Sequence, residues 1–431
     1  MQGMAATPGK RRTSVLDKLG MHPPLAWGFV AVLFLMSACG VESGFLSAYL
    51  VGKGFSASAV ALVFTVYGIT AAFASWLSGA LSDVWGPKRV MSIGLVIWLV
   101  FHVAFLSLGV ARSNYPLVLF FYAMRGFGYP LFAYGFLVWI TLATPTSKLG
   151  KSLGWFWFAF AGGFPTLGSV VAAFLVSRTG QYQTLWWALV FAAVGGLALA
   201  AVRDPSGIRR LAPASENPIR TLLSSATIAW EIPKIGIGGI IRTINTAAQL
   251  GFLVGFLVIL PVYCTTTVGF TLQQWLRLLT LLSITNVIWN LLFGFIGDKF
   301  GWRRTVALFG SAGCAVTTLM LYYSLAGHHY LLAVLSGMCF GATLSAYTPL
   351  GAIMAALAPA RKGAAMSILN LGAGASAWVG PAVVGSVQPL AGVGGVMWSF
   401  AILYVISAAL SLLMKVPEDP AGYRNSLGAK S

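Results

Sequence analysis

Long apolar runs, separated by short polar segments, follow one another along the whole chain. A helix needs about 20 predominantly apolar residues to cross the hydrocarbon core of a bilayer. Twelve runs reach this length, so the pattern predicts an all-α membrane protein with twelve transmembrane helices. The runs cover residues 25–51, 57–82, 90–110, 115–142, 152–177, 183–202, 236–263, 271–297, 304–326, 329–357, 363–391 and 393–414.

The longest polar segment between two runs lies near the middle of the chain, with six runs before it and six after it. It contains Pro205, Pro213, Pro218 and Pro233. Segments rich in proline and polar residues are typical of boundaries between domains. The predicted organisation is a cytoplasmic tail, a six-helix bundle, a linker, a second six-helix bundle and a second tail, at residues 1–24, 25–202, 203–235, 236–414 and 415–431.

A sequence motif that follows the second run recurs after the eighth. The string GALSDVWGPKR, at residues 79–89, returns 215 positions later as GFIGDKFGWRR, at residues 294–304. The dipeptide Gly54-Phe55 recurs at the same offset as Gly269-Phe270. A repeat of this length indicates that the two six-helix halves are duplicates.

Composition and charge agree with a membrane protein. The chain is 58% hydrophobic and 8% charged, a balance that would expose large apolar patches in a water-soluble protein. Its formal net charge of +18 comes from Lys and Arg at alternate ends of the apolar runs, rather than from one phosphate-binding stripe. This is the positive-inside pattern. We therefore predict a multi-pass protein of the cell membrane, embedded in the lipid bilayer, with both termini cytoplasmic and no nucleic-acid partner.

Neither a metal site nor a cofactor is predicted. The four cysteines, at positions 39, 264, 314 and 339, lack the spacing of metal ligands. The chain has no G-x-x-x-x-G-K-[ST] loop for ATP, and its apolar runs hold no Ser/His/Asp set or paired carboxylates. We therefore expect neither an enzyme nor an ATP-driven pump.

One carboxylate, that of Glu42, lies inside an apolar run, and an ionisable group at this depth indicates function. From the helical rise per residue, Glu42 lies roughly 14 Å and Arg125 roughly 15 Å from the same membrane face. We expect the two side chains to pair, because opposite charges offset part of each other's desolvation. The pair is the candidate proton-coupling site. The alternative is that Arg125 binds carbonyls freed near Gly126, Gly128 and Pro130.

Polar side chains recur on one face of several other runs. A single pair of this kind is more often a hydrogen bond between helices than a ligand contact, but several together favour a shared polar site. Aromatic faces suit the C–H surfaces of a sugar or polyol, although Trp at a helix end is usually an interface anchor. For His102, a satisfied core histidine is preferred to a proton relay. The candidate substrate-binding residues are Tyr129, Trp155, Arg242, Asn245, Gln249, Asn286, Asn290, Tyr347, Asn370 and Trp378.

The motif at residues 79–89 resembles the signature G-x-L-[AS]-D-x-x-G-x-[KR]-[KR] of the major facilitator superfamily. It stands where that family has it, between the second and third runs. The resemblance implies two six-helix bundles that rock about a central site. It also implies gating roles on the cytoplasmic side for Asp83 and Arg89, and in the repeated copy for Asp298 and Arg304. The alternative is a solvated turn that only fixes topology.

Several strings together resemble the polyol permeases, which are the ribitol and arabitol transporters of this superfamily. The strings are GVESGFLSAYL, FHVAFL, RGFGYPLF, LGWFW, IRTINT and KGAAMSILNLGAG. The resemblance implies uptake of a linear sugar alcohol together with protons. In the family pattern an acid can stand three positions before Glu42, where this chain has Cys39, and the difference leaves open both the proton stoichiometry and whether transport is coupled to protons at all.

The function expected from these observations is proton symport of a pentitol through alternating access by a monomeric carrier. Two alternatives stay open. Arg125 and Arg242 against one acid leave a net positive site, which suits an organic anion or another small polar solute. A membrane sensor that binds solute without moving it is the other, although the chain shows no sizeable soluble domain to pass on a signal.

Overall fold

The computed structural model describes residues 16, 19–43, 45–203, 218–253 and 259–416, and every element of regular secondary structure in these ranges is a helix. Most of the predicted tails, 1–24 and 415–431, and linker residues 204–217 lie outside the described residues. Ten helices in the described part are long and apolar enough to cross a membrane. The expected total of twelve, and the cytoplasmic termini, stay predictions.

The first half of the chain consists of long spans, some of which contain a π-helical turn. Helix α5 continues into the π-helical turn η2, and α8 continues through the π-helical turn η4 into α9. The elements of this half are η1 (Pro23–Leu25), α2 (Ala26–Ser43), α3 (Leu46–Gly52), α4 (Ala57–Trp85), α5 (Pro87–Ala104), η2 (Phe105–Val110), α6 (Tyr115–Arg125), α7 (Gly128–Ala143), η3 (Thr146–Lys148), α8 (Leu149–Ala161), η4 (Gly162–Leu167), α9 (Gly168–Thr179) and α10 (Gln181–Ala201).

The second half repeats this arrangement after a linker helix, α11 (Pro218–Glu231). The predicted run 236–263 is divided among α12, η5 and α13, and residues 254–258 of it lie outside the description. The elements are α12 (Pro233–Ala248), η5 (Gln249–Leu253), α13 (Ile259–Val262), η6 (Tyr263–Thr267), α14 (Leu272–Phe300), α15 (Trp302–Arg304), η7 (Thr305–Ala312), α16 (Gly313–Ala326), α17 (Tyr330–Ser345), α18 (Leu350–Leu357), η8 (Pro359–Arg361) and α19 (Lys362–Leu413).

Helix α19 is longer than one bilayer crossing, at 52 residues, and it is bent. Gly392 inside it has φ 63° and ψ −167°, which is not a helical conformation. Glycine adopts positive φ without the steric penalty that a Cβ atom brings. The bend falls at the predicted boundary between the runs 363–391 and 393–414.

Local sequence explains where several helices begin. Ser56 and Asn114 accept hydrogen bonds from the N–H groups of Ala59 and Leu117, at the starts of α4 and α6. Thr271 and Gln274 form a reciprocal capping box at the start of α14. Such caps satisfy backbone N–H groups that have no partner within the helix.

The two copies of the repeated motif have the same local geometry. Gly86 ends α4 with φ 82°, and Gly301 ends α14 with φ 102°. Gly54 and Gly269, the other repeated pair, also have positive φ, at 97° and 79°. The repeated glycines therefore mark turns that other residues adopt only with strain.

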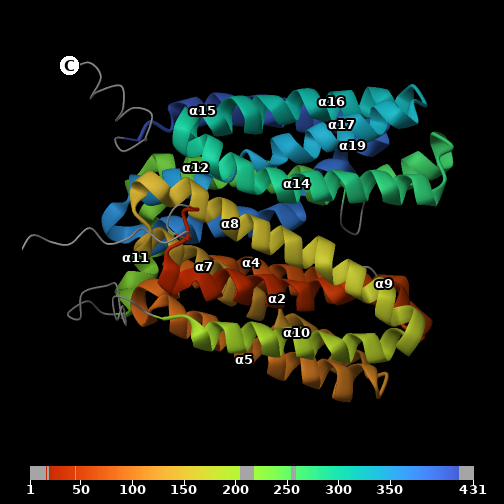
Figure 1. The fold of residues 1–431 in the computed structure, drawn as a ribbon. Coiled ribbons are helices and arrows are strands. Elements are labelled where there is room, and N and C mark those ends of the chain that lie inside the picture. The colour runs from red at the N-terminus through yellow and green to blue at the C-terminus, as the bar shows by residue number, and fades with distance from the viewer. Residues whose placement is uncertain (1–15, 17–18, 44, 204–217, 254–258, 417–431) are drawn as a thin grey trace, which may run out of the picture.

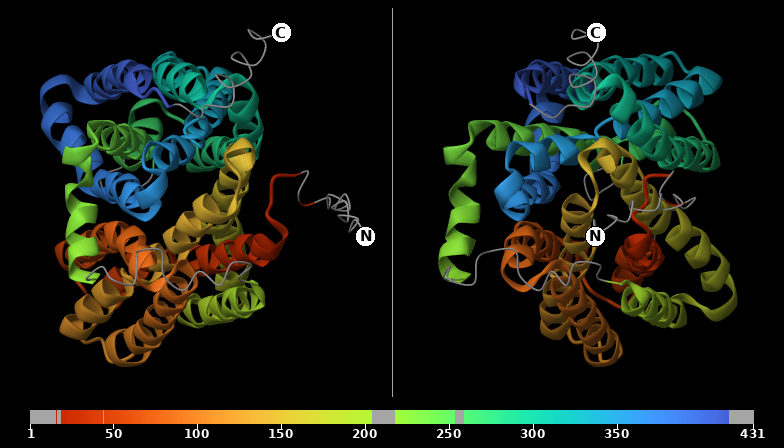
Figure 2. Two further views of the ribbon diagram at one scale, coloured as in Figure 1. Left: turned by 90° about the vertical axis from the view of Figure 1, so that its left-hand side faces the viewer. Right: turned by 60° about the vertical axis from the view of Figure 1, so that its left-hand side comes forward.

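The described ends of both halves lie at one end of the bundle, here called the linker end. The N–H of Arg203 donates to the Pro24 carbonyl at 3.2 Å, and Lys234 Nζ donates to the Lys415 carbonyl at 3.1 Å. Figure 1 shows α2 to α10 grouped on one side and α12 to α19 on the other. Helix α11 runs along the linker end from one group to the other and contacts α4, α12 and α19 (Figure 2). The linker end is the predicted cytoplasmic end.

Two helix pairs join the halves toward the linker end, α4 with α19 and α8 with α14. Glycines allow the close approach. A Cβ atom on Gly154 of α8 would lie 2.9 Å from the Asn290 carbonyl oxygen of α14, and one on Gly79 of α4 would lie 2.7 Å from the Ser367 nitrogen of α19. A side chain at either glycine would therefore push the halves apart.

Candidate functional site

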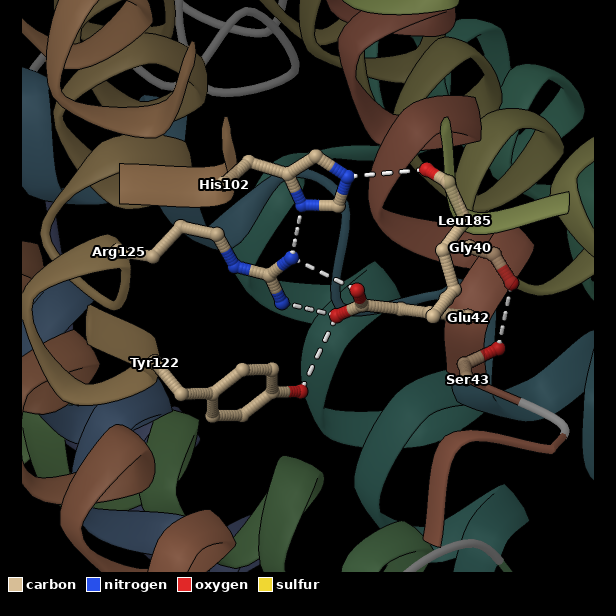
Figure 3. A network of polar contacts seen from close by, with 7 residues as sticks. All are labelled: Gly40, Glu42, Ser43, His102, Tyr122, Arg125 and Leu185. Carbon is tan, nitrogen blue, oxygen red and sulfur yellow. Dashed lines mark hydrogen bonds and ion pairs between the residues drawn. The ribbon is translucent and has the colours of Figure 1, made fainter. Parts of the chain in front are cut away.

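Glu42 and Arg125 form a buried ion pair in the first half of the chain (Figure 3). Glu42 belongs to α2 and is 4% exposed, and Arg125 ends α6 and is 0% exposed. Arg125 Nη1 donates to Glu42 Oε2 at 2.7 Å, and Nη2 donates to Oε1. Tyr122 donates its hydroxyl to Glu42 Oε1 at 3.1 Å. The two charges lie together, as the depth argument predicted, and their role in proton coupling stays a proposal.

Aromatic rings enclose the guanidinium group of Arg125. Its Cζ lies 4.4 Å from the centroid of the Tyr122 ring and between 5.5 and 5.8 Å from those of Trp98, Phe105 and Tyr67. A charge removed from water is costly unless a counter-charge and polar partners replace its hydration. Because Glu42 provides the counter-charge, binding of a proton to Glu42 changes the electrostatic balance of the whole site.

His102 of α5 contacts the same guanidinium from another direction (Figure 3). Its Nδ1 lies 2.6 Å from Arg125 Nη1, and its Nε2 lies 3.0 Å from the Leu185 carbonyl oxygen of α10. The imidazole stacks on Trp98, with centroids 4.5 Å apart and planes at 12°. His102 is thus a buried histidine with two polar partners, but one of them belongs to the charged pair.

A second cationic site, at Arg242 of α12, lies where the two halves meet. Arg242 Cζ lies 4.5 Å from the centroid of the Trp157 ring, on α8 of the first half. Tyr134 of α7 interacts with the guanidinium through a hydrogen bond, and Nη1 donates to Asn245 Oδ1 at 2.9 Å. Among the described residues, no carboxylate forms an ion pair with Arg242. Within the described part of the chain, this guanidinium therefore has no counter-charge.

Asn245 provides an unused donor next to Arg242. The residue is 1% exposed, and its Nδ2 is buried without a hydrogen-bond partner within the described ranges. Buried side-chain donors are nearly always satisfied by protein or water. Asn245 is therefore suited to donate to a water molecule or a solute held by Arg242.

The predicted amide residues of α14 bond mainly within the second half. Asn286 Nδ2 donates to Ser345 Oγ at 2.9 Å, and Asn290 Oδ1 accepts from Thr348 Oγ1 at 3.0 Å. The first contact is a bond between α14 and α17, which was the alternative interpretation of each polar pair, and the second joins α14 to the turn between α17 and α18. Asn370 instead crosses to the first half, where its Nδ2 donates to Ser78 Oγ at 3.3 Å.

Among the described residues, neither predicted tryptophan has a cation–π contact with Arg125 or Arg242. Trp155 donates its Nε1 hydrogen to the Leu19 carbonyl at 3.1 Å and so holds the chain before α2 against α8. Trp378 is 65% exposed on α19. We leave both out of the proposed binding site.

Three predicted residues remain. Tyr129 is half-buried, and its ring centroid lies 6.4 Å from those of Tyr67 and Tyr134. Because Tyr67 lies beside Arg125 and Tyr134 beside Arg242, a row of tyrosines connects the two cationic sites. Gln249 is half-buried in η5, and Tyr347 is buried with its hydroxyl 3.3 Å from Ser407 Oγ.

The acids of the repeated motif hold helix N-termini of the opposite half. Asp298 of α14 accepts hydrogen bonds from the N–H groups of Gly150 and Lys151, both at 3.0 Å, at the start of α8. Asp83 of α4 likewise accepts from Gly363 and Ala364 at the start of α19. A carboxylate at a helix N-terminus is stabilised by the free N–H groups and the helix dipole.

The basic residues proposed to act with these acids do not reach them. Arg89 and Arg304 are both exposed, and no hydrogen bond or ion pair joins either of them to Asp83 or Asp298. At the linker end, these acids thus make contacts from carboxylate to backbone across the two halves. This arrangement is a better candidate latch than the acid–base pair within one loop.

Replacing Asp298 by asparagine is expected to weaken the closed linker end. The change removes a buried charge–dipole interaction of about 2 kcal/mol, which is about 30-fold in the equilibrium between closed and open forms. The measurement is maleimide labelling of a Ser367→Cys reporter, which is buried while α4 packs on α19, in a protein without its native cysteines. Labelling should accelerate in Asp298→Asn but not in Lys299→Gln, an exposed neighbour. Equal labelling in both would contradict the latch.

Sequence reasoning missed three residues and had little signal for them. Tyr134 and Trp157 contact Arg242 from the first half, and Tyr122 contacts Glu42. Tyr122 had a signal, since it lies on the helix face of Arg125, and Trp157 had one as the aromatic residue two positions after Trp155; Tyr134 had none. Among the described residues, no group of three or more His, Cys, Asp or Glu side chains is placed to hold a metal ion.

Comparison with known proteins identifies the family. The family model of the Major Facilitator Superfamily matches residues 25–279 and 244–431. The chain is 40% identical to the alpha-ketoglutarate permease of Bacillus subtilis, over 94% of this chain and 92% of that protein. It is 35% identical to the ribitol transporter of Klebsiella pneumoniae, over 95% and 96% of the two chains.

A solved structure has the same fold at low sequence identity. The E. coli fucose:proton symporter superposes with a TM-score of 0.73 at 12% identity, over 91% of this chain and 98% of that one. The family match covers nearly the whole chain, and the relatives above match it at 40% and 35% identity across more than nine tenths of its length. The chain therefore belongs to the major facilitator superfamily, and it is a membrane transporter rather than an enzyme.

Proposed function

We propose that this transporter imports a linear sugar alcohol, a pentitol such as ribitol or arabitol, by proton symport through alternating access in the cell membrane. The observation that carries the proposal is the buried pair of Glu42 and Arg125. Glu42 lies in the last turn of α2, is 4% exposed, and accepts a hydrogen bond from the guanidinium of Arg125.

The chemistry of the pair supports proton coupling. An ionised Glu42 neutralises Arg125, whereas a protonated Glu42 donates instead of accepting at one oxygen and loses the ion pair. Tyr122 binds the same carboxylate, so protonation rearranges three side chains at once. Through Tyr67, Tyr129 and Tyr134 the rearrangement reaches the neighbourhood of Arg242. Proton binding and solute binding are then linked, as symport requires.

The contacts between the halves support alternating access. Asp83 and Asp298 hold helices of the opposite half at the linker end, and α4 and α8 pack there through glycines. With these contacts made, the linker end is closed. Breaking the two carboxylate latches together allows the halves to separate there and the solute to leave on that side. The linker end is the cytoplasmic end in this proposal, so the direction of transport is inward.

A binding site for a polyol is supported where α7, α8 and α12 meet. Trp157 and Tyr134 present aromatic faces for C–H groups, while Arg242 and Asn245 Nδ2 supply hydrogen-bond donors for hydroxyl groups. Residues from both halves contribute, so the site changes when the halves rotate. The 35% identity to a ribitol transporter supports the same class of solute.

One observation favours a second candidate, an organic anion. Arg242 has no carboxylate partner among the described residues, and an uncompensated guanidinium beside a solute site attracts a carboxylate. The relative with 40% identity is named as a permease for alpha-ketoglutarate, which is a dicarboxylate.

Uptake by purified protein in proteoliposomes tests both candidates. With an acidic exterior, labelled ribitol or arabitol should accumulate, and an inside-negative potential should accelerate uptake, because a proton with a neutral solute carries net positive charge. If labelled 2-oxoglutarate accumulates instead, and polyols do not compete, the polyol proposal is wrong and the second candidate holds.

Substitution of Arg242 tests independently whether the transported solute is a carboxylate or a neutral polyol. Arg242→Gln should reduce the affinity for a carboxylate by roughly 10- to 100-fold, since hydrogen bonds to charged groups are worth about 1.5–3 kcal/mol. The affinity for a neutral polyol should fall by less than about tenfold. Arg277→Gln, which changes an exposed residue of α14, is the matched control.

A further inference from the structure

We propose that His102 is a positioning residue for Arg125. It is held as the neutral imidazole with its proton on Nε2, and it keeps the guanidinium in place while Glu42 gains and loses a proton. The inference rests on the proposed coupling role of Glu42. In this proposal, His102 neither takes up nor releases a proton during the transport cycle.

The hydrogen-bond partners determine the form of the ring. Nε2 lies 3.0 Å from the Leu185 carbonyl oxygen, which only accepts, so Nε2 carries a hydrogen. Nδ1 lies 2.6 Å from Arg125 Nη1, which only donates, so Nδ1 is an unprotonated acceptor. An imidazolium would direct a second N–H at the guanidinium and add a positive charge beside it. The geometry is therefore that of one neutral tautomer.

The surroundings hold the ring in this orientation. His102 is 0% exposed and stacks on Trp98, one turn earlier in α5, with an angle of 12° between the rings. The partner on α10 is a backbone carbonyl, which does not change its charge. The ring therefore offers Arg125 an acceptor whose position is fixed from two other directions.

The other polar and titratable groups around the guanidinium do not offer an equivalent acceptor. Glu42 and Cys39 face it from α2, Tyr67 from α4, and Tyr122 from its own helix α6. Tyr122 and Tyr67 lie against the guanidinium with their ring faces. When Glu42 is protonated, His102 Nδ1 is the remaining neutral nitrogen that accepts from Nη1.

A shared donor has a consequence for the pH dependence of transport. Arg125 Nη1 divides its hydrogens between Glu42 Oε2 and His102 Nδ1. If the acceptor on His102 is removed, the guanidinium interacts with the Glu42 carboxylate alone, and it holds the carboxylate form more strongly. Protonation of Glu42 then requires a more acidic exterior. With His102 in place, uptake therefore operates at a higher external pH than it would with the ion pair alone.

Two substitutions separate acceptor strength from packing. His102→Asn can place an amide oxygen near the position of Nδ1, whereas His102→Phe keeps the stack on Trp98 and has no acceptor. We expect the external pH for half-maximal uptake to move lower in His102→Phe by about one unit or more, and to change little in His102→Asn. Equal profiles in the two variants would overturn the proposal. So would a His102→Phe protein that exchanges solute but no longer accumulates it in a pH gradient, since His102 would then carry the proton.

A spectroscopic measurement tests the tautomer without any transport assay. The chain has four histidines, so nitrogen NMR of protein labelled at histidine, compared with His102→Asn, assigns the His102 signals. We expect Nε2 to be protonated and Nδ1 unprotonated across the pH range in which uptake changes. An imidazolium, or a tautomer protonated on Nδ1, would refute the proposal. Because this result does not depend on the cargo, it stays informative even if the polyol or the coupling proposal fails.

Discussion

Replacing Glu42 by glutamine is expected to abolish uptake against a concentration gradient while leaving exchange of solute across the membrane intact. Glutamine has the shape of protonated glutamate and keeps an oxygen for Tyr122, but it cannot release a proton. Each pH unit across the membrane supplies about 1.4 kcal/mol, which is about tenfold in solute concentration. A variant that cannot couple loses this whole factor and only equilibrates the solute.

Proteoliposomes with and without a pH gradient measure the effect, and counterflow measures exchange. Glu231→Gln is the matched control. Glu231 is an exposed residue of α11 that pairs with Arg361 at 2.6 Å, and the hydrogen bond from Arg361 lowers the pKa of its carboxyl group. It therefore stays ionised throughout the assay range, and its loss should leave accumulation unchanged.

The variant leaves a buried arginine without its counter-charge, so its folding must be checked. Losing one partner of a buried ion pair typically destabilises a protein by about 3–5 kcal/mol. Glu42→Asp keeps an ionisable group, and it should retain part of the pH-driven accumulation if it folds. If Glu42→Gln concentrates the solute as the wild type does, Glu42 is not the coupling residue.

The Glu42 and Arg125 pair was predictable because it depends on few unknowns. An acid and a base inside apolar runs have no stable place against lipid, and the helical rise gives their depths. The repeated motif also marks two turns, since Gly86 and Gly301 occupy the same place in its two copies and both have positive φ. The charge pair needs only helical spacing, and the turns need only the residues of one short motif.

The partners of Asp298 and His102 were not predictable, because they are backbone groups of distant segments. Asp298 accepts from the N–H groups of Gly150 and Lys151, and His102 faces the Leu185 carbonyl. Nearly every residue has a backbone N–H and a carbonyl, so the sequence does not show which of them will form these hydrogen bonds. Only the packing of the helices brings them to the acid and the imidazole.

The tryptophans of α8 show a second limit. Trp155 and Trp157 are two positions apart, so their side chains point about 200° away from each other around the helix. Sequence favoured Trp155, but Trp157 is the one over Arg242, while Trp155 binds the Leu19 carbonyl. The crossing of α8 with α14 determines which face of α8 meets the second half. That crossing is set by glycines that contact residues distant in the sequence.

Replacing Gly154 by tryptophan at this crossing is expected to abolish transport by keeping the linker end open. A Cβ atom there would already lie 2.9 Å from the Asn290 carbonyl oxygen and 3.1 Å from the Gly294 Cα. Overpacking of a close contact costs about 1–3 kcal/mol or more, which is roughly 5- to 150-fold or more in the closing equilibrium. Transport needs both end states, so a protein that cannot close this end cannot return its empty site to the other side.

The control and the readout separate a blocked cycle from a misfolded protein. Gly162→Ala, on the same span, would place its Cβ no closer than 3.7 Å to any neighbour and should transport normally, whereas Gly154→Ala should fall between the two. The buried Ser367→Cys reporter should be labelled by maleimide faster in Gly154→Trp than in the parent, while binding of solute and the unfolding temperature in detergent are retained. If Gly154→Trp transports at the parent rate, the close crossing of α8 and α14 is not part of the cycle. If its labelling stays slow while transport is lost, the linker end still closes and the interpretation of the crossing as a gate is wrong.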